Sequence, residues 1–135
     1  LLASLDAARQ HMSLHGKALL TEAMNLANWA RHEINWNIPG LYVYGNDMVG
    51  MPGCPAYDPT KLIISVRALG VSGFEIERIL RQGFHIQVEL SDLYNVICIV
   101  TNLAMYEKRK SRYLLYRLWP IYHEKLIIAK RERYP

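Results

Sequence analysis

The chain has 135 residues, of which 51% are apolar, and a formal net charge of +4. This composition supports one modest domain with its own core and excludes a disordered or fibrous protein. The longest apolar runs fall far short of the roughly 18 residues that a membrane helix needs, so we expect no transmembrane segment.

The first 36 residues predict helices. Apolar residues recur at steps of three, four and seven, which is typical of an amphipathic helix. Gly16 costs about 1 kcal/mol relative to alanine inside a helix. We therefore expect two helices, about 2–15 and 17–36, with a break or kink between them, and Pro39-Gly40 stops the second. The apolar face comprises Leu5, Met12, Leu19, Ala23, Leu26, Ala27, Ala30 and Ile34.

Two β-prone segments follow. Residues 41–44 (Leu-Tyr-Val-Tyr) predict a short first strand, and the Gly- and Pro-rich residues 50–55 predict a loop. Residues 61–66 (Lys-Leu-Ile-Ile-Ser-Val) predict a strand in the middle of a sheet, because the run is too apolar for an edge that faces water.

A capped helix comes next. Ser72 and Glu75 form a Ser-x-x-Glu capping box, in which each side chain satisfies a free backbone amide at the start of a helix. We expect this helix to run to about Gln82. Gly83 then occupies the position at which a left-handed residue closes a helix.

Two more strands are expected near 86–89 and 95–101, with Ser91-Asp92 as a turn between them. The order of elements predicts an α+β fold. In this fold, long N-terminal helices precede a small mixed or antiparallel sheet that has helices packed on one face.

Four separated blocks carry a resemblance to a known family: Leu2–Arg9, Asp58–Leu62, Gly70–Gly73 (Gly-x-Ser-Gly) and Val88–Asn95. In order and in spacing, they resemble the Orn/Lys/Arg decarboxylases. These enzymes depend on pyridoxal 5′-phosphate (PLP) and have an aspartate-aminotransferase-like, type I fold. The resemblance covers roughly residues 1–101 and suggests the C-terminal part of such an enzyme.

The resemblance implies a division of the chain. Residues 1–36 would be the helical end of a large domain and the linker to a small domain. Residues 37–101 would be the α+β small domain, and residues 102–135 a basic C-terminal helix or tail that departs from the family pattern. The implied enzyme is a lyase that releases CO₂ from lysine, arginine or ornithine to give a polyamine precursor. It would be a homodimer or higher oligomer, in which this chain forms the substrate-side wall.

The resemblance also concerns the cofactor. The lysine that holds PLP in this family lies in a Ser-x-His-Lys context in the large domain, and His-Lys occurs nowhere in this chain. Decarboxylation needs that amine and a pyridinium partner that makes the ring an electron sink. We assign neither group, so we expect no catalytic residue here and no PLP bound by this chain alone. A large PLP-binding domain, absent here, is its expected partner, because the chain opens on Leu1 and reads as part of something longer.

Four residues are candidates for substrate binding. Glu89 could pair the distal cation of a basic amino acid, or it could be a solvated strand-end glutamate. Asp92 and Tyr94, with Asn95, could line the same cleft, although Ser-Asp is also a turn signal that favours a structural role. Arg67 could bind the substrate carboxylate through its guanidinium, or it could be an ordinary exposed arginine.

Other features predict little chemistry. His11 and His15 share a helix face, but no Glu or Cys completes a metal site with them or with His32, so we expect no metal. Cys54 has no basic neighbour in the sequence that would activate a thiol, so we assign it no chemistry. The two cysteines, Cys54 and Cys98, favour a reducing compartment, and the cytoplasm is the expected location.

The positive charge is concentrated at the C-terminal end. Residues 1–106 carry 7 Lys/Arg against 9 Asp/Glu, whereas residues 107–135 carry 9 against 3. One interpretation of residues 108–119, which mix basic and aromatic side chains, is contact with nucleic acid or an anionic bilayer. The other is a closing helix on the sheet, with Leu114, Leu115, Leu118 and Ile121 inward. The alternative function is thus a non-catalytic module whose tail contacts nucleic acid or protein, although nucleic acid gains no support from the body of the chain.

Overall fold

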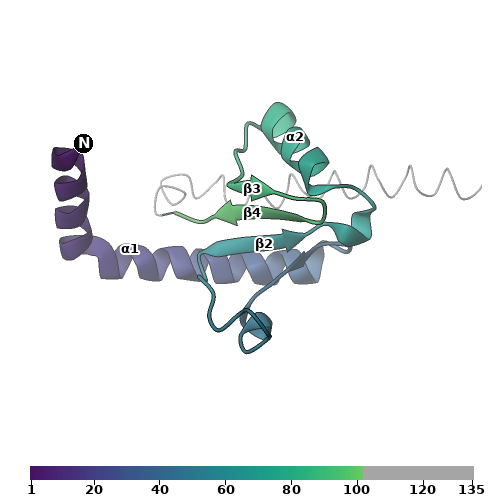
Figure 1. Cartoon of the computed structure of the whole chain (residues 1–135), viewed down its shortest axis with the longest axis horizontal. Helices are drawn as coiled ribbons and strands as arrows, with labels where there is room; N and C mark the ends of the chain where they lie inside the picture. Colours follow the sequence, from purple (N-terminus) through teal and green to yellow (C-terminus); the bar gives the residue numbers. More distant parts are fainter. Residues whose placement is uncertain (102–135) are drawn as a thin grey trace, which may run out of the picture.

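A single antiparallel sheet of four strands organises the computed structural model, which describes residues 1–101 (Figure 1). The strands are β1 (Tyr42–Val43), β2 (Lys61–Ser65), β3 (Leu90–Ser91) and β4 (Asn95–Ile99), in the spatial order β1-β2-β4-β3. β2 and β4 pair along their full lengths, so the apolar run beginning at Lys61 is central, as predicted. The predictions for residues 102–135 lie outside the described residues.

Two helices and two short 3-10 turns complete the described residues. The helices are α1 (Leu2–Asn37) and α2 (Gly73–Phe84), and the turns are η1 (Asn46–Met48) and η2 (Arg67–Leu69). α1 contacts β1 and β2, and α2 contacts β3 and β4. Each helix therefore covers one half of the sheet.

Both helices pack on the same face of the sheet. Burial alternates along β2, with Leu62 and Ile64 buried, and Val43 and Val96 lie beside Ile64 in the neighbouring strands. These side chains join residues of both helices in one cluster, which confirms the predicted α+β fold. The cluster comprises Ala27, Ala30, Ile34, Ile38, Leu41, Val43, Leu62, Ile64, Val66, Ile76, Leu80, Val88 and Val96.

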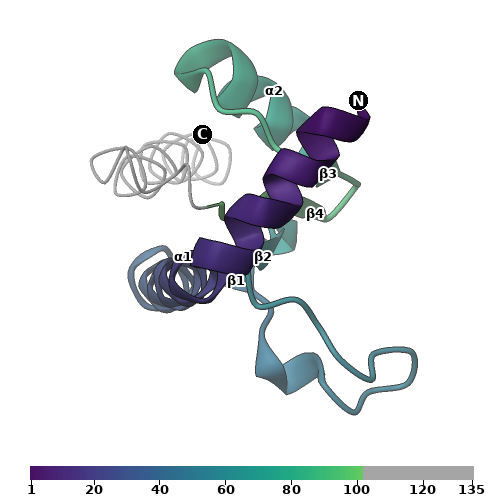
Figure 2. The same ribbon diagram turned by 90° about the vertical axis from the view of Figure 1, so that its left-hand side faces the viewer.

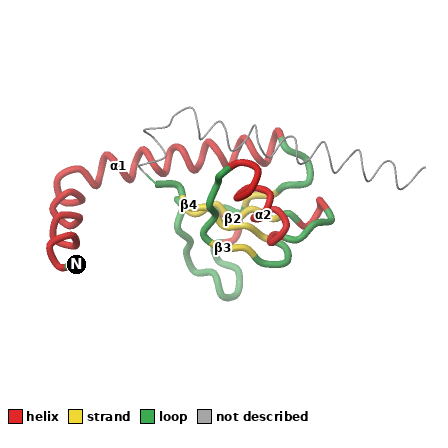
Figure 3. Tube along the Cα trace, turned by 90° about the horizontal axis from the view of Figure 1, so that it is seen from above, coloured by secondary structure: helices red, strands yellow, loops and turns green. Residues whose placement is uncertain are grey.

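α1 is one continuous helix of 36 residues that bends in its N-terminal part (Figures 1 and 3). The kink agrees with expectation, but the predicted break into two helices is wrong. A single glycine costs only about 1 kcal/mol, which the continuing hydrogen-bond ladder offsets. Gly16 is itself buried, and the Met12 side chain lies over it, with Cε 3.2 Å from where a Cβ would stand.

α2 begins as predicted and ends later. Ser72 Oγ accepts a hydrogen bond from Glu75 N at 3.2 Å, as the capping box requires. The predicted end at Gln82, with Gly83 left-handed, is wrong: the helix runs to Phe84, and His85 takes the left-handed conformation at φ 55°. The reason is packing, because Phe84 lies against the core and helical geometry brings it there.

The strand predicted at 86–89 is also misplaced. Val88 buries its side chain in the core, but regular pairing with β4 begins only at Leu90. Glu89 contributes one ladder bond, from its N–H to the carbonyl of Ile97 at 2.9 Å. Ile86 and Val88 pack against or within the core, so this segment has the apolar residues of a strand although its backbone is an irregular connection. In residues 1–101, no helix is both long enough and apolar enough to cross a membrane.

Candidate functional site

The four predicted site residues fall at two ends of the sheet. Arg67, Asp92 and Tyr94 lie at the end where Ser65 pairs with Asn95. Glu89 precedes Leu90, which pairs with Ile97, and so lies toward the other end. Three residues of strand separate Glu89 from the level of Asn95, which corresponds to about 10 Å. The structure therefore brings three of the four together and sets Glu89 apart.

Arg67 and Tyr94 are in direct contact. The guanidinium carbon lies 4.4 Å from the centre of the Tyr94 ring, a distance at which a cation is attracted to the ring face. The backbone fixes both residues, because Val66 N–H donates to the Tyr94 carbonyl at 2.8 Å. Both side chains are exposed, so the guanidinium keeps an open side for an anion.

A shallow cleft of about 400 Å³ adjoins Arg67. Its lining is mostly apolar, and Arg67 is the charged member; the lining residues are Gly40, Leu41, Tyr42, Ser65, Arg67 and Ala68. The Tyr42 hydroxyl donates to Asp47 Oδ2 at 2.7 Å. This bond raises the pKa of Tyr42, so the phenol at the cleft stays protonated, and it is also the main cause of the lowered pKa of Asp47.

Asp92 is occupied by the turn between β3 and β4. Its Oδ1 accepts from the backbone N–H groups of Tyr94 at 2.7 Å and Asn95 at 2.8 Å, and Asn95 Nδ2 reaches both oxygens. The bond from Tyr94 N–H is the largest cause of the lowered pKa of Asp92, followed by the Asn95 side chain. These contacts support the structural interpretation of Asp92, and they leave its role in substrate binding a prediction.

The start of α2 presses on the same turn. A Cβ added to Gly73 would stand 2.2 Å from the Asn95 carbonyl oxygen and 2.4 Å from that of Asp92. A side chain at this position is excluded by backbone atoms, which cannot rotate away. Close packing against these carbonyl oxygens therefore explains why the Gly70–Gly73 block ends in a glycine.

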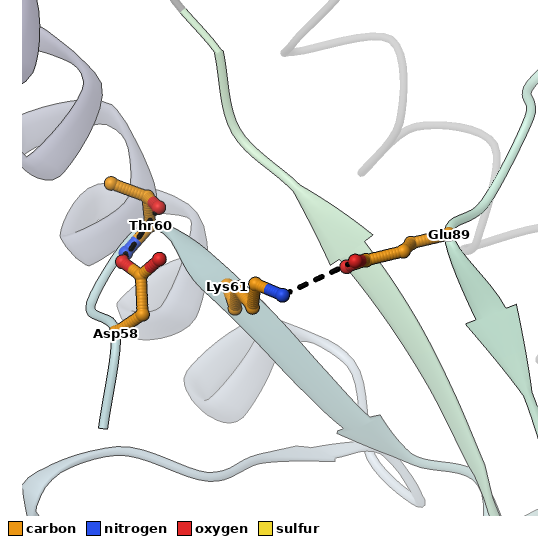
Figure 4. Close-up of polar contacts among 4 residues, drawn as sticks. All are labelled: Asp58, Thr60, Lys61 and Glu89. Atoms are coloured by element: carbon orange, nitrogen blue, oxygen red, sulfur yellow. Dashed lines mark hydrogen bonds and ion pairs between the residues drawn. The ribbon is translucent and has the colours of Figure 1, made fainter. Parts of the chain in front are cut away.

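Glu89 forms an ion pair with Lys61 at 3.2 Å, and Figure 4 shows that the pair links β2 to the start of β3. The two side chains are 42% and 37% exposed, so the pair is open to solvent and weak in stability terms. Asp58 accepts from Thr60 N at 2.9 Å and from Thr60 Oγ1 at 2.7 Å, which lowers its pKa. The Asp-Pro-Thr-Lys run is therefore a turn that starts β2 and sets Lys61 opposite Glu89.

Two residues of α1 form hydrogen bonds with backbone groups at the edge of the sheet. The sequence patterns did not identify either of them. Asn35 bonds the backbone of Val43 on both sides, accepting from its N–H at 2.7 Å and donating to its carbonyl at 3.2 Å. Arg31 donates to the carbonyls of Tyr44 at 2.9 Å and Pro59 at 3.2 Å. It thereby holds both ends of the loop that projects from the sheet (Figure 2). The only available signal was their i, i+4 spacing beside the apolar stripe, and their partners are backbone groups.

The described residues do not fit PLP by themselves. Of the two lysines in residues 1–101, Lys17 is exposed on α1 and Lys61 is paired with Glu89, and neither lines the cleft. Within the same residues, no three His, Cys, Asp or Glu side chains are grouped to hold a metal. Both cysteines are free, and burial raises the pKa of the Cys98 thiol to about 11, which keeps it protonated.

Comparisons with known proteins find relatives of one kind. The chain is 50% identical over 101 residues to the protein named arginine decarboxylase of Bacillus subtilis, and 52% identical over 101 residues to that of Halalkalibacterium halodurans. In both, the match covers 75% of this chain and 20% of the relative. The chain thus spans about a fifth of the length of the curated relatives it matches. No family model matches the chain. No solved structure matches it either.

Proposed function

We propose that this chain is a segment of a PLP-dependent decarboxylase of basic amino acids, with arginine as the substrate, and that it forms the substrate-side wall of the active site. The observation that carries the proposal is the similarity of 46–52% identity over 101 residues to four relatives that share the name arginine decarboxylase. The PLP amine comes from polypeptide outside the described residues. Assembly as a dimer and a reducing, cytoplasmic location belong to the same proposal.

Arg67 holds the substrate carboxylate in this proposal. Its guanidinium is the cation at the cleft, and a planar guanidinium binds a carboxylate through two parallel hydrogen bonds. Contact with the Tyr94 ring restricts the plane of the guanidinium before substrate arrives. Less conformational freedom is then lost on binding.

In the same proposal Glu89, which lies toward the other end of the sheet from Arg67, holds the distal cation at the far end of an extended substrate. The Lys61 ammonium, 3.2 Å from Glu89 Oε1, shows that a cationic group fits beside this carboxylate. Because the pair is partly exposed, a substrate guanidinium can replace Lys61 at modest cost. When bound by the complete enzyme, PLP supplies the electron sink for the carbanion left by loss of CO₂. The residues described here bind and orient the substrate.

A chimera tests the proposal. Residues 1–101 of this chain replace the matched segment of the Bacillus subtilis relative, and CO₂ release is measured from arginine, lysine and ornithine. We expect release from arginine at a rate within about tenfold of the parent, which is 1.4 kcal/mol in the barrier. A soluble chimera that binds PLP but releases no CO₂ from any of the three would contradict the proposal.

Two substitutions in the chimera separate substrate binding from a structural ion pair. Glu89→Gln removes a charged hydrogen bond worth about 1.5–3 kcal/mol, so we expect KM for arginine to rise about tenfold or more while PLP absorbance is unchanged. Lys61→Met breaks the same ion pair but leaves the carboxylate, so KM should not rise. Equal increases for the two variants would show that Glu89 acts only through Lys61.

The second candidate function is a non-catalytic binding module, and it rests on the excess of 9 Lys/Arg over 3 Asp/Glu in residues 107–135. Such a tail would bind RNA or DNA with strong salt dependence. Binding by the full chain that disappears when Lys108–Arg112 are neutralised, together with an inactive chimera, would favour this candidate over the enzyme.

A further inference from the structure

The face of the sheet that points away from both helices has an apolar centre. The helices pack on the face that carries Leu62 and Ile64, so the alternate residues of β2 and β4 point to the other face, which we call the open face. Three side chains form a row across its middle, because Ile97 pairs with Ile63 on one side and with Leu90 on the other. All three are partly or fully exposed, and none belongs to the core.

Charges of opposite sign lie on either side of this row. Lys61 is on the open face by the same alternation, and its ammonium lies 3.2 Å from the carboxylate of Glu89 (Figure 4). At the opposite end of the sheet, Tyr42 and Ser65 are a cross-strand pair, and both line the cleft in which Arg67 is the cation. A group that can bind an anion and a group that can bind a cation are therefore separated by an apolar strip.

The separation of these two groups fits one class of ligand. The level of Glu89 lies about three strand residues, or about 10 Å, from the level of Asn95 at the Arg67 end. In extended arginine the carboxylate carbon and the guanidinium carbon are about 7–8 Å apart, at roughly 1.5 Å per bond. Hydrogen bonds at the two ends span the remainder. The fitting ligand has a carboxylate, then an aliphatic chain, then a distal cation.

We infer that the row of Ile63, Ile97 and Leu90 lies beneath the aliphatic chain of the substrate and selects its length, because strand register fixes the charged groups on either side. This inference rests on the proposed function, and it makes Ile97, at the centre of the row, a specificity-determining residue. Charge complementarity identifies the occupant, since a lipid chain or an apolar peptide would leave the Arg67 guanidinium without an anion. A shorter amino acid would pair with only one of the two charges.

Binding of two guanidino acids to the full 135-residue chain tests this selection of length. The compound 5-guanidinopentanoate has the charge spacing of arginine, and 3-guanidinopropionate is two bonds shorter. Neither carries the amine that PLP chemistry requires. Dissociation constants are measured by amide chemical-shift titration. We expect millimolar binding of the longer compound, with shifts at both the Arg67 and the Glu89 ends, and about tenfold weaker binding of the shorter one, which loses one charged contact.

A matched pair of substitutions tests the row itself. Ile97→Thr keeps a β-branched side chain in the strand but replaces apolar carbon with a hydroxyl, so we expect it to weaken binding of 5-guanidinopentanoate about fourfold. The control is Ile99→Thr. Ile99 is on the same strand and face and is 45% exposed, but it lies beyond the level of Glu89, so its substitution should leave binding unchanged.

The outcomes separate this inference from the proposed function. Equal affinity for the two compounds, equal effects of the two substitutions, or no saturable shift at millimolar concentrations would overturn the inference even if the chimera releases CO₂. Length-selective, Ile97-dependent binding beside a chimera that binds PLP but releases no CO₂ would count against the proposed function alone. Without ligand, amide shifts in residues 107–135 that Ile97→Thr causes and Ile99→Thr does not would identify the tail as the occupant and overturn the inference. The comparison of the two compounds needs no variant.

Discussion

At the Ser65 and Asn95 end of the sheet, the carboxylate of Asp92 accepts hydrogen bonds from two backbone N–H groups and one side chain. At the Lys61 end, the carboxylate of Glu89 meets one half-exposed ammonium. The first carboxylate is held by several hydrogen bonds of the turn, whereas the second is held by a partly exposed ion pair, which contributes little to stability. Glu89 and Asp92 lie three positions apart in the Val88–Asn95 block, yet their carboxylates are in different physical environments. The difference arises because the backbone N–H groups of Tyr94 and Asn95 lie beside the carboxylate of Asp92.

The largest effect on stability is expected at the Ser65 and Asn95 end of the sheet. Gly73→Ala places a Cβ against two backbone carbonyl oxygens, so the start of α2 or the turn must move. We expect a loss of about 3 kcal/mol in the free energy of unfolding, measured by urea titration.

The matched control is Gly83→Ala in the same helix, where a Cβ would have nothing within 4 Å. It should stabilise the protein by about 0.5–1 kcal/mol, because alanine restricts the unfolded chain and favours helix. Similar losses for both variants would mean that the close approach of α2 to the turn is not a stability determinant.

A smaller effect concerns acid stability. The pKa of Asp92 is lower in the folded chain than its ordinary value, so its contribution is fully present above the unfolded pKa of about 4 and is lost as pH falls through the folded value. Asp92→Asn keeps the turn acceptor without the charge. We expect its unfolding midpoint to fall less steeply than that of wild type below pH 4. Parallel pH profiles would show that the charge of Asp92 does not stabilise the turn.

The smallest effect on stability is expected at the Lys61 end of the sheet. Lys61→Met removes an ion pair with partners 42% and 37% exposed, so we expect a change of no more than about 0.5 kcal/mol in unfolding free energy. Urea titration at two salt concentrations measures it. A loss above about 2 kcal/mol would mean that the pair is part of the fold, and it would remove the contrast with Asp92.

Local signals predicted much of the fold. The apolar run beginning at Lys61 is the central strand, the Ser72 cap is formed, and Ser91-Asp92 leads into a turn, because each depends on neighbours within a few residues. The end of α2 was misjudged at Gly83, since packing of Phe84 against the core outweighed the preference of glycine for a left-handed turn.

The site was only partly predictable, because its geometry depends on contacts between distant segments. The contact of Arg67 with Tyr94 follows from pairing of β2 with β4, and the offset of Glu89 by about 10 Å follows from the register in which Leu90 pairs with Ile97. The hydrogen bonds between Asn35 and Val43 join a side chain to backbone groups eight residues away. No spacing rule identifies such a partner, because every residue has the same backbone groups.

The proposed function requires that this chain shapes a pocket whose PLP amine lies elsewhere. The most direct test is CO₂ release from arginine, with added PLP, by the full 135-residue chain and by the chimera with the Bacillus subtilis relative. We expect no release from the chain alone and release from the chimera. Release of CO₂ by the chain alone would contradict this expectation.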